Sequence, residues 1–204
     1  MANKNYTLWL AGICAVVFII QLIIPGFTES MLLDQSKSLE IWRFVTSIFL
    51  HGSFAHIFSN MFALVLFGLI LENIIGGRNF ILVYFGTGIF ANLIAINFYP
   101  SSLGASGAIY GILGVLIMLR PKMVVWAFGL PMPMFIAGIL WVGAGVMGVF
   151  MPSNVGDIAH LSGIGFGILL GWLYRKRYRD VRWRENRISL NEDSMRRWED
   201  NYVR

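Results

Sequence analysis

Charged residues are scarce in this chain. They make up 13% of the 204 residues, whereas hydrophobic residues make up 57%. Soluble domains carry about 25% charged residues, so this balance excludes an ordinary soluble domain and predicts a polytopic membrane protein. Cysteine is almost absent as well. Cys14 is the only one, which excludes an intrachain disulfide.

The sequence also lacks the usual signs of a metal site. Of its three histidines, His51 and His56 are five residues apart and therefore lie off a common helical face. No HExxH motif and no cluster of carboxylates accompanies them. We therefore expect neither a metal site nor a cofactor.

The positive charge is concentrated at the C-terminus. Ten of the sixteen Lys and Arg residues follow Tyr174. A basic tail, residues 175–204, that directly follows an apolar segment indicates a topology signal or contact with anionic lipid rather than binding to nucleic acid.

Long apolar runs dominate the remainder. A bilayer core of about 30 Å requires about 20 apolar residues per helix. This length predicts an all-α bundle of six transmembrane helices within a single domain, residues 1–174. The predicted spans are 7–25, 54–75, 79–99, 105–119, 124–150 and 156–174.

Two of the remaining stretches carry further information. Segment 26–53 is rich in Leu, Ile, Phe and Trp, so we expect a structured loop in the outer membrane interface, with Trp42 as an aromatic anchor. The fifth span contains Pro131 and Pro133, which predict a kink or a break into two pieces.

The positive-inside rule gives the orientation. Lys4, Arg78, Arg120, Lys122 and the tail fall on one side of the six predicted spans. The opposite side holds only two basic residues, and three acidic residues offset them: Lys37 and Arg43 against Glu29, Asp34 and Glu40. Both termini are therefore predicted to be cytoplasmic.

The fourth span is too short to cross the membrane. Ser106 to Leu119 is 14 residues, or about 21 Å of helix, against a core of about 30 Å. Because Arg120 and Lys122 hold its far end at the cytoplasmic surface, Ser106 is expected about 9 Å below the outer boundary. Irregular backbone before it, residues 100–104, is tolerated at this depth only beside protein or a water-filled hollow that opens outward.

Glycines recur at helical spacing on the fourth and sixth spans. They form one stripe on each span: Gly107, Gly111 and Gly114 on the fourth, and Gly163, Gly167 and Gly171 on the sixth. Such stripes allow two helix backbones to approach closely. Because both spans run from outside to inside, packing of the stripes brings His160 beside Ser106.

This arrangement suits acyl transfer. A serine becomes a nucleophile when a base lies within hydrogen-bonding reach, and imidazole is the usual base. Tyr110, one turn after Ser106, is placed to pack on the His160 ring. His56 and Asn60, at positions i and i+4 of the second span, together with the Ser106 amide, are candidates for an oxyanion hole. Asp157 is interpreted as a cap at the start of its helix.

Each residue also has a simpler interpretation. Ser106 alone is typical of a helix-packing serine, and His160 alone of a histidine at the membrane interface. His56 and Asn60 are also typical of polar pairs that hold helices together. His51 is interpreted as structural.

In this order, the motifs resemble those of the rhomboid family of intramembrane serine proteases, over nearly all of residues 40–172. The matching motifs are GxSG at Gly104 to Gly107, HxxxN at His56 to Asn60, AHxxGxxxG at Ala159 to Gly167 with Gly163 between them, a loop signature at Glu40, Trp42 and Arg43, and GxxxExxxG at Gly68, Glu72 and Gly76.

The resemblance implies a six-helix protease with a Ser106–His160 dyad and no acidic third member. It implies that His56, Asn60 and the Ser106 amide hold the oxyanion, and that Tyr110 stacks on His160. The expected substrates are membrane proteins, single-span or polytopic, cleaved from the extracytoplasmic side of the cell membrane. The fifth helix and the 151–156 loop resemble the family's gate and cap.

Two other functions remain open at this point. One is a catalytically inactive rhomboid-like protein that binds transmembrane segments, and such a protein is expected to have lost the serine or the histidine. The other, more distant, is a small transporter whose polar groups line an outward cavity.

Overall fold

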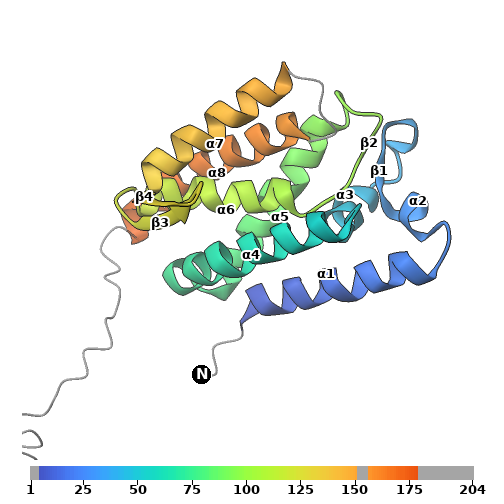
Figure 1. The fold of residues 1–204 in the computed structure, drawn as a ribbon, viewed down its shortest axis with the longest axis horizontal. Coiled ribbons are helices and arrows are strands. Elements are labelled where there is room, and N and C mark those ends of the chain that lie inside the picture. The colour runs from blue at the N-terminus through green and yellow to red at the C-terminus, as the bar shows by residue number, and fades with distance from the viewer. Residues whose placement is uncertain (1–4, 151–155, 179–204) are drawn as a thin grey trace, which may run out of the picture.

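α-Helices make up most of the protein (Figure 1), and the computed structural model describes residues 5–150 and 156–178. Its longer helices are α1 (Tyr6–Ile23), α4 (Phe54–Ile75), α5 (Gly77–Ala95), α6 (Ser106–Leu119), α7 (Met134–Val149) and α8 (Asp157–Tyr178). By length and composition, α1, α4, α5 and α8 are each able to cross a membrane, whereas α6 and α7 are shorter apolar helices. The predicted all-α, multi-pass membrane fold is thereby confirmed.

Helix α6 lies at the centre of the bundle. It contacts α4, α5, α7 and α8, and ten of its fourteen residues are buried. The reason is compositional, since α6 is apolar on every side and carries no charge, a pattern typical of a helix with protein all around it. The residue that begins this helix, Ser106, is therefore held by the most enclosed element of the described chain.

The segment between α1 and α4 is folded. It contains α2 (Phe27–Met31), β1 (Leu33–Asp34), α3 (Arg43–Thr46) and two turns of 3₁₀-helix, Gln35–Lys37 and Ser47–Phe49. Arg43 is almost fully buried at its centre. Its guanidinium donates to Glu40 over 2.7 Å, and to the backbone carbonyls of Glu29 and Leu32 over 2.9 and 2.8 Å. One side chain of α3 thus joins this helix to α2 and to the loop at Glu40.

Glu72 fastens the start of α1 to α4. Its carboxylate accepts hydrogen bonds from the backbone N–H of Tyr6 over 2.8 Å, the N–H of Thr7 over 3.0 Å and the Thr7 hydroxyl over 2.7 Å. A carboxylate on the first amides of a helix also meets the positive end of the helix dipole. Gly68 and Gly77 leave space for Thr7 and Tyr6 at this contact.

The predicted fifth span, 124–150, differs from the structure in its first part. Residues 124–133 form an antiparallel hairpin of β3 (Val124–Ala127) and β4 (Leu130–Pro133), and the helix begins only at Met134. Pro131 and Pro133 explain the break, because proline supplies no backbone N–H to a helix. Phe128 and Gly129 both have positive φ at the turn, as two-residue hairpin turns require. The break was expected from the sequence, but the strands were not.

Other sequence-based expectations fall partly outside the described residues. The loop 151–156 is described only at Gly156, and the basic tail 175–204 only as far as Tyr178, which belongs to α8. The interpretations of that loop as a cap, of the fifth helix as a gate, and of the tail as a lipid contact therefore stay predictions.

Candidate functional site

A serine and a histidine meet near one end of the bundle. Ser106 is the first residue of α6, and His160 lies in the first turn of α8. The Ser106 Oγ and the His160 Nε2 are 2.8 Å apart, within hydrogen-bonding distance. The residues are 54 positions apart in the sequence, so the packing of α6 against α8 creates the pair.

Glycines set this packing. A Cβ added at Gly163 would collide with the carbonyl oxygen of Gly107, and one added at Gly167 would lie 2.9 Å from the Cα of Gly111. One turn further along, a Cβ at Gly171 would lie 3.0 Å from the Cα of Val115. Because the contacts advance in the same direction on both helices, α6 and α8 run parallel with their backbones touching.

Tyr110 fixes the orientation of the imidazole. Its ring stacks on that of His160, with 4.3 Å between the centroids and an angle of 3° between the planes. Tyr110 and Ser106 are one helical turn apart and so lie on the same face of α6. The two residues together determine where the ring lies and where its Nε2 points.

His56 approaches the serine from the second long helix, α4. A Cβ on Gly104 would lie 2.9 Å from both Cε1 and Nε2 of His56, so the ring lies directly on the backbone of the GxSG turn. Gly104 has a φ of +128°, a conformation that side chains rarely adopt. The Gly52 N–H donates to the His56 Nδ1 over 3.4 Å. With Nδ1 accepting, the neutral ring carries its proton on Nε2, next to the serine turn.

Asn60 lies one turn after His56 on α4. It is only 6% exposed, and its Nδ2 is buried without a hydrogen-bond partner among the described residues. A buried amide donor that lacks a partner costs free energy, about 1–3 kcal/mol.

His51 is a neighbour that the sequence did not single out for the site. Its ring is almost fully buried and meets the His56 ring edge to face, with centroids 5.1 Å apart. Burial, and to a smaller extent the nearby His56, lower the pKa of His51 to about 4. His51 is therefore neutral at pH 7, and it packs on His56 without adding charge. Its spacing of five from His56 gave no sign of this contact.

The backbone leading to Ser106 is held by protein. β2 (Ser101–Ser102) pairs with β1, and the Gly104 N–H donates to the Ser47 carbonyl over 2.9 Å. Asn92 of α5 donates to the Ser47 hydroxyl over 3.0 Å and to the Phe44 carbonyl over 2.9 Å. Asn92 was not predicted for the site from the sequence, although a polar residue within an apolar helix was the available signal.

Asp157 begins α8 and is buried. Its carboxylate lies against Gly148 of α7, where an added Cβ would come within 2.6 Å of Oδ1. Tyr99 accepts a hydrogen bond from the next amide, Ile158 N, over 3.1 Å. The start of α8 is thus fixed both to α7 and to the turn that follows α5.

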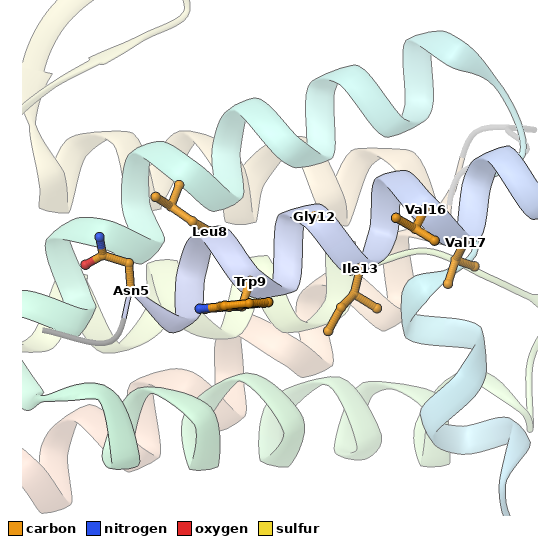
Figure 2. Close-up of a pocket in the computed structure, with 7 residues that line it drawn as sticks. All are labelled: Asn5, Leu8, Trp9, Gly12, Ile13, Val16 and Val17. Atoms are coloured by element: carbon orange, nitrogen blue, oxygen red, sulfur yellow. The ribbon is translucent and has the colours of Figure 1, made fainter. Parts of the chain in front are cut away.

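A hollow of about 680 Å³ lies elsewhere, along α1 (Figure 2). Six of the seven residues that line it belong to α1 and the seventh, Asn5, precedes it: Asn5, Leu8, Trp9, Gly12, Ile13, Val16 and Val17. None of them is a residue predicted for the serine site. The hollow is mainly apolar and belongs to the outer face of a membrane-spanning helix.

Comparison with known families fits this geometry. The model of the rhomboid family, described as the rhomboid domain, matches residues 38–177. This chain belongs to the rhomboid family. The matched range includes Ser106, His160, His56, Asn60 and Tyr110.

Individual rhomboid relatives give the same result. YdcA of Bacillus subtilis is 35% identical over 140 residues, which cover 66% of this chain and 67% of the relative. The rhomboid protease GlpG of Haemophilus influenzae is 25% identical over 180 residues, which cover 83% of this chain and 91% of the relative. The mitochondrial rhomboid protein 1 of Saccharomyces cerevisiae is 32% identical over 160 residues, which cover 72% of this chain and 45% of the relative. The matched region is therefore about half of that longer relative.

Proposed function

We propose that this rhomboid is an intramembrane serine endopeptidase that cleaves membrane-protein substrates by a Ser106–His160 dyad. The observation that carries the proposal is the 2.8 Å separation of the Ser106 Oγ and the His160 Nε2, with the imidazole stacked on Tyr110. A nucleophile in contact with a base, and a third group that orients the base, are the parts that covalent catalysis requires.

In this mechanism the Ser106 oxygen attacks the carbonyl carbon of the scissile peptide bond. His160 accepts the serine proton at Nε2 and then donates it to the leaving amine, which breaks the C–N bond and leaves an acyl-enzyme. Water, activated by the same Nε2, then releases the acyl product. The stacking of Tyr110 takes the orienting role that a carboxylate has in a triad.

The negative oxygen that develops at the carbonyl needs hydrogen-bond donors. We assign this role to the Nε2–H of His56, the Nδ2–H of Asn60 and the backbone N–H of Ser106. The partnerless amide of Asn60 supports the assignment. So does the start of α6, because the positive end of a helix dipole lies there.

The proposed substrates are single-span or polytopic membrane proteins. We place both termini in the cytoplasm on the positive-inside rule, so the site opens to the extracytoplasmic side of the cell membrane. A six-helix domain over residues 1–174 and contact of the tail 175–204 with anionic lipid complete the proposal. No cofactor is required for this chemistry.

The alternative is an inactive rhomboid-like protein that binds transmembrane segments. The presence of both Ser106 and His160 within hydrogen-bonding distance favours the enzyme. A binding protein also has no need of the buried Asn60 amide that lacks a hydrogen-bond partner.

A fluorophosphonate probe distinguishes the enzyme from the binding protein, because it reacts covalently only with an activated serine. We expect the detergent-solubilised protein to be labelled, and Ser106→Ala to lose all labelling. Ser162→Ala is a matched control, since the Ser162 hydroxyl donates to the Ala159 carbonyl of its own helix. Equal labelling of wild type and Ser106→Ala, or no labelling of either, would contradict the proposal.

Asn60→Ala tests the oxyanion assignment. We expect this change to lower kcat about 100-fold to 1000-fold, because one donor to the developing charge is lost. KM and the melting temperature should change little, since the amide has no partner in the free protein. Ser59→Ala is the control, as Ser59 is exposed and its hydroxyl donates to the His56 carbonyl. An Asn60→Ala enzyme with wild-type kcat would remove Asn60 from the mechanism.

A further inference from the structure

The hairpin β3–β4 carries a row of exposed apolar side chains. We call Val124, Trp126, Phe128 and Leu130 the hairpin surface; they are 66%, 71%, 60% and 63% exposed. The alternate residues Val125 and Ala127 are each only 6% exposed and belong to the main core. On β3, Val124 and Trp126 therefore form an outward apolar face opposite Val125 and Ala127, and the exposed Phe128 and Leu130 lie at the turn and directly after it.

Water is an unfavourable environment for this face. Large contiguous apolar patches are rare on protein surfaces that face water, and they mark sites of contact with another protein or a membrane. Both strands of the hairpin contact α7, where Phe135 and Ile139 are 43% and 66% exposed. Because α7 is an apolar helix of a multi-pass membrane protein, its exposed side chains are expected to face lipid, and the hairpin lies next to them.

The position of the hairpin along the bundle is consistent with contact with the membrane. Figure 1 shows β3 and β4 at the end of the bundle where α6 finishes and α7 begins. The 16 residues of α7 give about 24 Å of helix, less than the bilayer core of about 30 Å. The hairpin directly precedes α7 in the chain, so it lies at that end of the short helix, near the boundary of the membrane core.

We propose that the hairpin surface is a membrane-docking element that inserts into the headgroup layer of the inner leaflet. The open edges of a two-stranded sheet carry unpaired backbone groups, which exclude the hydrocarbon interior but are satisfied at the headgroup level. Tryptophan is enriched at this depth. Exposed Lys122, two residues before the hairpin, and Arg120 add positive charge that suits anionic lipid.

Spin labels attached to introduced cysteines test the proposal. Cys14, the native cysteine, is fully buried, and Cys14→Ala supplies a background without thiols. Trp126→Cys and Ile139→Cys are labelled in full-length protein in liposomes that contain anionic lipid, and the same spin label free in buffer is the water reference. Collision with oxygen, which concentrates in lipid, is compared with collision with a water-soluble nickel chelate.

We expect the ratio of oxygen to nickel collision at position 126 to be several-fold higher than that of the free label in buffer, and lower than at position 139 on α7. A ratio at position 126 equal to that of the free label would place the hairpin in water and overturn the proposal. Low collision with both reagents at position 126, relieved by diluting the protein in lipid, would overturn it in favour of a second copy.

The native tryptophan supplies a second measurement, which does not depend on labelling. Lipids brominated near the headgroup quench nearby indoles, and we expect Trp126→Phe to reduce the quenched fraction of the fluorescence. Trp172→Phe, on an exposed part of α8, is the comparison. An unchanged quenched fraction in Trp126→Phe would contradict insertion of the hairpin.

Discussion

A His160→Ala variant is expected to cleave a single-span model substrate at least about 10⁴-fold more slowly than the wild type. The change removes the base that lies 2.8 Å from the Ser106 Oγ, and losses of this size or larger are found when a member of a nucleophile and base pair is removed. The loss corresponds to about 5 kcal/mol of transition-state stabilisation. It is measured as kcat/KM in liposomes, with the melting temperature recorded to show that the fold persists.

Asp157→Asn is the informative companion, because Asp157 is the acidic residue closest in sequence to His160. We expect this variant to keep most of the activity. The imidazole is held by Tyr110, and the carboxylate lies against Gly148 of α7. If the two variants lose activity to a similar extent, Asp157 is the third member of a triad and the dyad mechanism is wrong.

Gly167→Ala is expected to reduce activity about 100-fold and to lower the melting temperature. The new methyl group would lie 2.8 Å from the carbonyl carbon and 2.9 Å from the Cα of Gly111. Backbone atoms have no alternative rotamer, so α6 and α8 must separate. A displacement of about 1 Å between reacting groups costs about 100-fold in rate. Cleavage kinetics and thermal unfolding in detergent measure the two effects.

Gly165→Ala provides the matched control on the same helix. A Cβ at Gly165 meets no atom within 4 Å, and the residue is exposed. Alanine is intrinsically favoured over glycine in a helix by about 1 kcal/mol, so both variants gain helix propensity equally. Any difference between them therefore measures the contact between the two backbones. Wild-type activity in Gly167→Ala would show that the close approach of α6 and α8 is not needed.

The pairing of Ser106 with His160 could be predicted from patterns that are visible in the sequence. Glycine spacing marks the faces of two helices, and the short length of the fourth span sets its position along the membrane normal. The order of the spans then makes those helices parallel. These patterns in the sequence therefore place Ser106 and His160 at the same depth in the membrane. Their roles in catalysis stay predictions until the labelling experiment is done.

The hairpin could not be predicted with the same ease. Residues 124–133 are almost uniformly apolar, so the alternation that marks a strand is hidden and the segment resembles the start of a transmembrane helix. Its turn uses Phe128 and Gly129 rather than the common Asn-Gly pair. Pro131 and Pro133 predicted that the helix would be interrupted, but proline does not determine which structure replaces it.

The supporting contacts of the site depend on tertiary structure and were also missed. The contact of His51 with His56, and the hydrogen bonds of Asn92 to the turn at Ser47, join segments that are distant in the sequence or lie off a common helical face. Hydrophobic periodicity says nothing about such pairs. A polar residue in an apolar span indicates a partner without identifying it.

The enclosure of α6 by four other helices has a consequence for how the bilayer affects this protein. Lipid does not touch most of the helix that carries Ser106, because ten of its fourteen residues are covered by protein. Membrane thickness and acyl-chain composition therefore influence the reacting oxygen only through movements of α4, α5, α7 and α8. Amide protons in the middle of α6 should accordingly exchange with deuterium more slowly than those of α1, whose outer face is open to the membrane.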